Sequence, residues 1–384
     1  MAAPPGPHFM PMGAPPPPPR PHFMPMGAPP PPPPPPGPHF MPGMMPGPGP
    51  GPRPVAYENP PGYSIQKKLG EGGFGCVFRA IHLRSNRTCA LKSIDISTLS
   101  RKYRELAIKQ WLVEVEALVK VASHPNVVSY RKAFDTGWKL WVEMEFCGGG
   151  DLTHYLSGWT TRISRTVKRK IIQDIASAVA YLHEQAIVHR DIKADNVLIL
   201  ILITALAYNS GHREALDITA KLADFGLAKV IATCNFEGSL ETYYMDCTCG
   251  TRYYLAPEVL EGKYTLMADV FSMAVLFTAI VTESKIPKQG YMTSYIKDAT
   301  GKIWAFGEYM MMTKSDVAIR SSFSAGGNLR NLINSMLQYD YHKRPTAKEV
   351  YHTITTMISV DDFPKDPKNV KRGWGDRPVP PPPK

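Results

Sequence analysis

Apolar and polar residues alternate along residues 63–94, and this period of two predicts β-strands with a glycine-rich turn between them. A second alternating stretch, WKLWVEMEF at residues 138–146, predicts another strand. Both stretches lie in the first half of the chain, so we expect a sheet to form there.

Three other stretches are typical of helices. Residues 101–122 have an apolar stripe made of Trp111, Val115, Leu118, Val119 and Ala122. Residues 164–183 have a second stripe made of Ile171, Ile172, Ile175, Ala178, Val179 and Leu182. Residues 267–281, MADVFSMAVLFTAIV, are apolar nearly all round, which predicts a helix buried in the middle of a lobe. A small strand-rich part followed by a larger helical part predicts an α+β fold.

Both ends of the chain depart from these patterns. Residues 1–54 hold 26 of the 39 prolines and contain the segment PHFMP three times. Such a tract cannot bury a core, so we expect residues 1–60 and 361–384 to be disordered tails. The stretches Pro15–Arg20 and Arg377–Pro383 match ligands of Src-homology-three, WW or profilin-type domains, although a tail without any partner explains them equally well.

The net charge of +11 is compatible with an acidic partner, but a solvated basic surface is the simpler interpretation, and we expect no nucleic-acid partner. The six cysteines form no C-x-x-C pair, and the first residues show no secretory signal. These features favour a reducing, intracellular setting, in the cytoplasm or the nucleus. The apolar run Val197–Ala207 is far shorter than the ~20 residues of a membrane span, so we expect no such span.

A glycine-rich segment and a lysine indicate phosphate binding. The segment LGEGGFGCV contains the spacing G-x-G-x-x-G, and glycines let the backbone amides approach phosphate oxygens closely. Its residues are Leu69, Gly70, Glu71, Gly72, Gly73, Phe74, Gly75, Cys76 and Val77. Dinucleotide-binding folds use the same spacing, but here Ala90-Leu91-Lys92 follows on an expected strand, where a lysine can pair with two phosphates.

Lys92 needs a carboxylate to hold it, and the expected helix at residues 101–122 offers Glu114 and Glu116. These two residues lie about 200° apart around a helix, so only one can face the lysine. Glu114 lies closer to the apolar stripe, and we therefore favour it.

Two further motifs supply an acid–base group and metal ligands. His189-Arg190-Asp191 is followed by Asn196, and Asp224 opens the sequence Asp-Phe-Gly. Asp191 can accept the proton of an attacking hydroxyl, while Asn196 and Asp224 can hold Mg²⁺ against the phosphates of a nucleotide. Each motif alone is weak, but their common order, closed by Ala-Pro-Glu at residues 256–258, indicates phosphoryl transfer.

Together these residues resemble the eukaryotic protein kinase family over residues 63–357. The resemblance implies two lobes: residues 63–146, with a five-stranded antiparallel sheet and one helix, and residues 147–357, which are mostly helical. It also implies ATP as cofactor and protein serine or threonine hydroxyls as substrates. Further residues of the nucleotide pocket, by this resemblance, are Met144 as gatekeeper, the hinge residues Glu145 and Cys147, and the apolar Ala90 and Leu198 above and below adenine.

The resemblance implies other roles as well. Lys193, two residues after Asp191, is typical of serine/threonine kinases, in which it steadies the transferred phosphate. Asp269 is similar to the aspartate that holds the His-Arg-Asp backbone, and Arg344 is similar to the ion-pair partner of Glu258. The large lobe is also similar to the PDLIM-interacting kinase-like group, which implies a nuclear location and actin-linked partners.

One departure keeps a second hypothesis open, that of a weakly active or pseudokinase scaffold with Pro-rich docking tails. Asn196 and Asp224 are 28 positions apart, whereas most kinases cross this distance with one tight hairpin. The extra segment could be a longer strand pair, an apolar docking loop or a gene-model error. We expect residues 197–199 to pair with residues 221–223, and residues 201–217 to project from the turn.

Overall fold

The computed structural model describes residues 58–72, 75–157, 163–202, 217–226, 228–230, 251–286, 290, 292–319 and 327–365. Both Pro-rich tails, apart from a few residues at their inner ends, lie outside this part of the chain. So do residues 231–250 between Asp224 and Ala-Pro-Glu.

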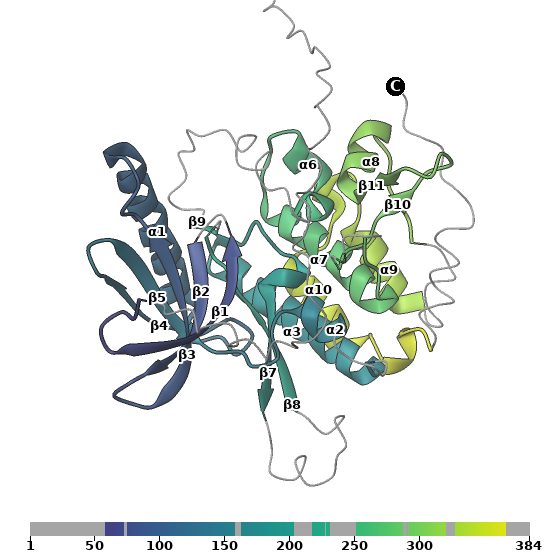
Figure 1. Cartoon of the computed structure of the whole chain (residues 1–384). Coiled ribbons are helices and arrows are strands. Elements are labelled where there is room, and N and C mark those ends of the chain that lie inside the picture. The colour runs from purple at the N-terminus through teal and green to yellow at the C-terminus, as the bar shows by residue number, and fades with distance from the viewer. Residues whose placement is uncertain are drawn as a thin grey trace, which may run out of the picture. The chain divides into compact units, whose positions relative to one another are not determined.

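The first lobe contains the predicted sheet and helix (Figure 1). Five antiparallel strands pair in the order β1-β2-β3-β5-β4, as the resemblance implied. The strands are β1 (Tyr63–Gly72), β2 (Gly75–His82), β3 (Arg87–Asp95), β4 (Tyr130–Asp135) and β5 (Lys139–Glu145). Because side chains alternate along a strand, Cys89 and Leu91 of β3 pack in a small core with Trp141, while Ala90 and Lys92 face the other side.

Helix α1 (Arg101–Val121) packs against this sheet on a face that overlaps the predicted stripe only in part: Leu118 is buried, and Trp111 and Val115 are partly buried against the core. Its buried residues are Glu114, Ala117, Leu118 and Val121, which follow the i, i+3, i+4, i+7 spacing of one helix face. Val119 is 56% exposed, so its assignment to the buried stripe was wrong. The apolar residues of α1 allowed more than one stripe, and contact with the sheet selected the stripe that contains Glu114.

The second lobe is mostly helical. Its helices are α2 (Leu152–Ser157), α3 (Arg165–Glu184), α6 (Pro257–Leu260), α7 (Leu266–Thr282), α8 (Phe306–Thr313), α9 (Gly327–Met336) and α10 (Ala347–Thr356). Short 3₁₀ turns span Ala194–Asn196, Thr251–Tyr254, Tyr341–Lys343 and Val360–Asp362. Three small antiparallel sheets join β6 (Ile187–Val188) with β9 (Lys229–Val230), β7 (Val197–Leu202) with β8 (Asp217–Leu222), and β10 (Ile296–Lys297) with β11 (Ile303–Trp304).

Helix α7 forms the centre of this lobe, as its apolar sequence predicted. It begins after Thr265, whose hydroxyl accepts a hydrogen bond from the Met267 amide at 3.2 Å. Its residues from Ala268 to Thr282 are all buried. Among the described residues, no helix is both long and apolar enough to cross a bilayer.

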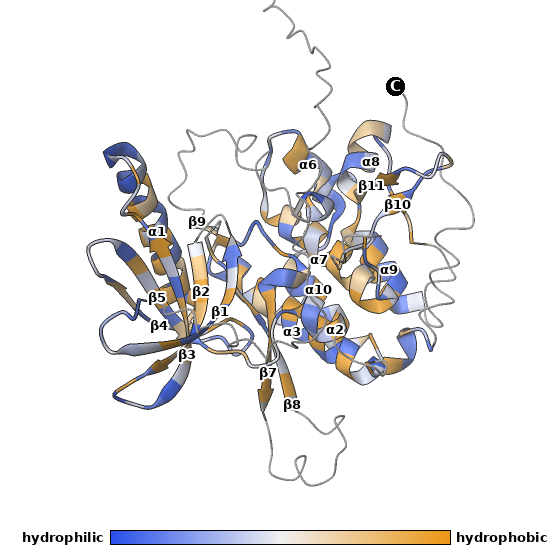
Figure 2. Cartoon of the chain, in the orientation of Figure 1, coloured by the Kyte–Doolittle hydropathy of each residue, from blue (hydrophilic) through white to orange (hydrophobic). Residues whose placement is uncertain are grey.

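The β7–β8 hairpin carries the inserted segment. The expected pairing is present, with Val197 opposite Leu222 and Ile199 opposite Ala220. The ladder continues further than we predicted, to Leu202 opposite Asp217. Figure 2 shows apolar colouring along both strands, and Figure 1 shows the hairpin extending away from the helices. The first apolar residues of the insertion therefore lengthen a strand pair, while residues 203–216 lie outside the described part of the chain.

Candidate active site

A pocket of about 600 Å³ lies between the sheet and the helical lobe, and it contains most of the predicted nucleotide-binding residues. The predicted residues that line it are Leu69, Gly70, Val77, Ala90, Lys92, Glu114, Met144, Glu145, Cys147, Asn196, Leu198 and Asp224. They come from β1, β2, β3, α1, β5 and the segment after it, the 3₁₀ turn before β7, β7 itself and the segment after β8, so the fold brings together segments that are far apart in the sequence.

Lys92 connects three elements at the inner end of this pocket. Its ammonium group donates hydrogen bonds to Glu114 Oε1 at 2.6 Å and to Asp224 Oδ1 at 2.9 Å. Lys92 and Glu114 are both buried. The lysine of β3, the glutamate of α1 and the aspartate after β8 therefore meet at one point.

Lys92 and Asp224 stabilise each other's charged forms. Burial by itself would lower the pKa of Lys92, but the carboxylates of Asp224 and Glu114 raise it above its usual value. Burial would likewise raise the pKa of Asp224, but the nearby Lys92 ammonium lowers it below its usual value. Lys92 is therefore a cation and Asp224 an anion at neutral pH, which are the charges needed for phosphate and metal binding.

The predicted catalytic residues lie together in the loop between β6 and β7. Lys193 Nζ donates to Asp191 Oδ2 at 2.6 Å. Asn196 Nδ2 donates to the Asp191 carbonyl and to Asp191 Oδ2, both at 2.8 Å. Two side chains thus fix the orientation of the Asp191 carboxylate, which is mostly buried.

The backbone of this loop is held from α7. Asp269 accepts hydrogen bonds from the backbone amides of His189 at 2.8 Å and Arg190 at 2.9 Å, as predicted. Burial would raise the pKa of Asp269, but hydrogen bonding and charge from His183 and His189 lower it. Arg190 and Asp224 adopt φ values of 73° and 62°, which are unfavourable for residues other than glycine. The strained backbone therefore lies at or next to two of the predicted functional residues, Asp191 and Asp224.

The oxygen atoms in the pocket suit Mg²⁺. The amide nitrogen of Asn196 is engaged by Asp191, which leaves the amide oxygen as a ligand, and Asp224 supplies carboxylate oxygen. Mg²⁺ prefers oxygen ligands and is commonly held by one or two protein groups together with nucleotide phosphates. Among the described residues, no group of three or more His, Cys, Asp or Glu could hold a metal ion alone. Two oxygen ligands, from Asn196 and Asp224, fit a Mg²⁺ ion that nucleotide phosphates also hold.

The protein kinase domain model matches residues 63–354, which is most of the chain. The chain belongs to the protein kinase family. It is 27% identical over 291 residues to serine/threonine-protein kinase 33 of Mus musculus, covering 75% of this chain and 53% of the mouse protein. It is 29% identical over 299 residues to serine/threonine-protein kinase dst1 of Dictyostelium discoideum, covering 77% of this chain and 35% of that protein. The matches thus span about half or less of these relatives.

In this kinase, Gly75 of the glycine-rich segment occupies a position that only glycine can fill. Gly73 and Phe74 lie outside the described residues, while Gly72 pairs with Gly75 at the end of the β1–β2 ladder. Gly75 has a φ of +104°, and a Cβ there would lie 1.9 Å from the Ser93 carbonyl oxygen, so only glycine fits.

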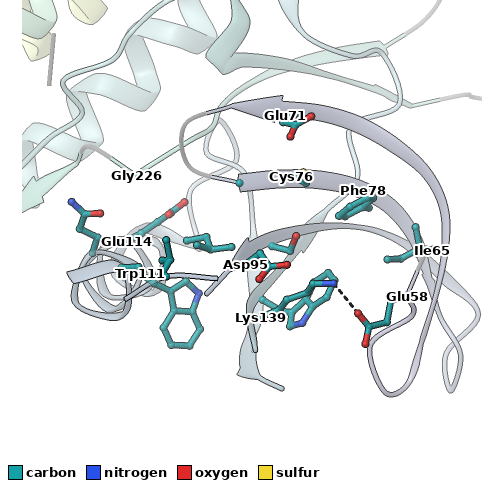
Figure 3. A pocket seen from close by; sticks show the side chains of 17 residues that line it. Glu58, Ile65, Glu71, Cys76, Phe78, Asp95, Trp111, Glu114, Lys139 and Gly226 are labelled. Carbon is teal, nitrogen blue, oxygen red and sulfur yellow. Dashed lines mark hydrogen bonds and ion pairs between the residues drawn. The ribbon is translucent and has the colours of Figure 1, made fainter. Parts of the chain in front are cut away.

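Glu71 and Cys76 line a second pocket of about 520 Å³, which lies beside α1 on the other face of the sheet (Figure 3). Trp111 and Lys139 lie on its wall, and Lys139 pairs with Glu58 at 2.8 Å. The side chains of Glu71 and Cys76 therefore do not line the pocket between the lobes, and any contact with a phosphate there would come from their backbone.

Sequence reasoning missed several residues that line the pocket between the lobes of this kinase. Arg79 lines it and lies over the Phe146 ring, 5.2 Å from the ring centre. Strand alternation from Val77 could have placed Arg79 on this face. Val128 also lines the pocket, but it comes from an irregular segment in which no periodicity indicates its position.

A buried ion pair lies at the start of α6 in the second lobe. Arg344 donates to Glu258 through both terminal nitrogens, at 2.6 and 2.8 Å, as the resemblance implied. Both side chains are at most 4% exposed. The arginine thereby holds the Ala-Pro-Glu segment at the start of α6.

Proposed function

We propose that this kinase transfers the γ-phosphate of ATP to serine and threonine hydroxyls of proteins, with Mg²⁺ as the metal ion. The contact of Lys92 with both Glu114 and Asp224 carries this proposal, because it assembles the phosphate-binding and metal-binding groups in one place. The intact Asp191, Lys193 and Asn196 cluster supports it further.

In the proposed reaction, Asp191 orients the substrate hydroxyl and accepts its proton as the oxygen attacks the γ-phosphorus. A new P–O bond forms to the substrate, the bond between the γ-phosphorus and the bridging oxygen breaks, and ADP leaves. Lys193 lies close enough to Asp191 to offset charge on the transferred group, and Lys92 holds the non-reacting phosphates. Asn196 and Asp224 would hold Mg²⁺, which supplies charge neutralisation when bound.

The choice of serine and threonine rests on two observations. Lys193 follows Asp191 by two positions, as in the serine/threonine branch, and both relatives named above are serine/threonine kinases by name. The other roles in the nucleotide site are proposed residue by residue, and all of these residues line the pocket. Ala90 and Leu198 would lie above and below the adenine ring. The backbone of Glu145 and Cys147 would form hydrogen bonds with adenine, and Met144 would be the gatekeeper.

We further propose that the chain belongs to the PDLIM-interacting kinase-like group and acts in an intracellular setting, in the cytoplasm or nucleus. For the tails we propose Src-homology-three, WW or profilin-type domains as partners of Pro15–Arg20 and Arg377–Pro383. Immobilised peptides of these two stretches should retain such domains, and peptides with their prolines changed to alanine should not.

Phosphoamino-acid analysis tests the proposed reaction. Purified full-length protein is incubated with γ-labelled ATP, Mg²⁺ and a mixture of protein substrates. We expect label in phosphoserine and phosphothreonine that disappears when Mg²⁺ is chelated. Label mainly in phosphotyrosine would overturn the substrate class. Nucleotide binding without any transfer would favour the scaffold alternative.

A further inference from the structure

Lys221 is a buried lysine to which the proposed reaction gives no role. It lies in β8, opposite Leu198 and three residues before Asp224. Its side chain is only 7% exposed, and its ammonium group lies 2.8 Å from Glu145 Oε1 and 3.5 Å from the Val127 carbonyl oxygen. A buried lysine is costly unless a partner compensates for lost hydration, so this ion pair must be formed for the site to be stable.

The partner, Glu145, is the last residue of β5 and the first residue of the hinge, which we define as residues 145–147. The same Oε1 atom accepts a hydrogen bond from the Ser129 amide at 2.6 Å. The Glu145 amide in turn donates to the Ser129 carbonyl at 3.0 Å. Both the backbone and the side chain of Glu145 are therefore fixed, and the residue also lines the nucleotide pocket.

The segment 126–129 completes the connection between the hinge and β8. Val128 donates its amide to the Leu222 carbonyl at 2.9 Å, and the Leu222 amide donates to the Asn126 carbonyl at 2.8 Å. This segment therefore lies between β8 and the end of β5. The Lys221–Glu145 ion pair spans this segment, so it joins the strand that leads to Asp224 with the edge of the pocket.

We propose that Lys221 is a positioning residue that holds the hinge in place for recognition of the adenine 6-amino group. This inference rests on the proposed use of ATP. Without the ammonium group, the Glu145 carboxylate would be left largely buried, with one amide donor and no opposite charge among the residues that the structure describes. Such a charge turns toward water, and Glu145 would take the adjoining hinge backbone with it.

The test compares two nucleotides in full-length protein: ATP, and purine riboside triphosphate, which lacks only the 6-amino group. Affinities are measured by competition with a fluorescent nucleotide, so the readout does not require phosphate transfer. We expect the unmodified protein to bind ATP about fivefold more tightly, the worth of one hydrogen bond. Lys221→Met should reduce this ratio to nearly one, and Lys221→Arg should keep it within about twofold of the original.

Lys168→Met is the matched control. Lys168 is also a buried lysine, and it pairs with Glu283 at 2.8 Å in the helical lobe. Lys168→Met should lower the melting temperature, as Lys221→Met should. It should leave unchanged the ratio of the affinity for ATP to the affinity for purine riboside triphosphate. Glu145→Gln is a milder second variant in case Lys221→Met does not fold, and it should lower the ratio at least twofold while retaining an acceptor for Ser129.

An unchanged ratio in Lys221→Met or Glu145→Gln would overturn the positioning role. So would an equal loss in Lys168→Met, because the effect would then reflect general destabilisation. A protein that shows the expected ratios but transfers no phosphate would support the role of Lys221 and refute the proposed function. The two claims can therefore fail separately.

Discussion

The ammonium group of Lys92 lies 2.6 Å from the Glu114 carboxylate, although the two residues belong to different elements, β3 and α1. Both side chains are less than 10% exposed. The pair therefore couples the position of α1 to the position of Lys92, the proposed phosphate-binding group.

Glu114→Gln should lower kcat/KM for ATP about 100-fold, because Lys92 would lose its charged partner on α1 and move relative to the phosphates. Steady-state kinetics at varied ATP would measure this loss. Glu116→Gln is the matched control, since Glu116 is exposed on the same helix and should have almost no effect. Equal losses in both variants would contradict the assigned role of Glu114.

Arg344→Met should lower the free energy of unfolding by about 3–5 kcal/mol, because it leaves the Glu258 carboxylate buried without its partner. Urea denaturation followed by circular dichroism would measure the change. Lys343→Met serves as the control, because Lys343 is exposed and makes only a 3.7 Å contact with Asp340. A loss below about 1 kcal/mol in Arg344→Met would show that Glu258 finds another partner.

Asp298, in the turn between β10 and β11, should make the protein less stable as the pH falls into the acidic range. Its carboxylate accepts hydrogen bonds from Thr300 and Lys302, and from the Trp304 indole at 2.8 Å. These bonds lower the pKa of Asp298 to about 2. Because the pKa in the folded state is below that of the unfolded chain, the stabilisation is complete above about pH 4 and is lost as the pH falls toward 2.

Asp298→Asn should therefore be less stable than the unmodified protein at pH 5, and the gap should narrow at pH 3. Urea titrations at the two pH values would measure both gaps. A gap of the same size at pH 5 and pH 3 would show that the carboxylate charge does not contribute.

Much of the fold and the site could be predicted because the motif residues lie in or next to strands and helices with a clear pattern of apolar and polar residues. Lys92 followed from an alternating strand, and the phase of α1 favoured Glu114 over Glu116. The same reasoning misplaced Val119, because α1 has apolar residues on more than one face and only the sheet decides which face is buried. The extra β7–β8 pairs were also missed, since an apolar run does not reveal where a ladder ends.

Lys221 could not be predicted for a different reason. Its neighbours in the sequence are apolar strand residues, and its partner Glu145 comes from the other lobe. No local sequence pattern connects two residues that lie so far apart along the chain. Contacts of this kind depend on how the strands are brought together, and they become visible only in three dimensions.

The most direct test of the central claim, that this site catalyses phosphate transfer, is the single-turnover rate of purified protein compared with that of Asp191→Asn. Binding of ATP is measured in parallel, since Asp191 acts on the hydroxyl and the two proteins should bind ATP within about threefold of each other. We predict a transfer rate about 100- to 10,000-fold lower in Asp191→Asn, the range for loss of a general base. Equal rates in the two proteins would contradict the account.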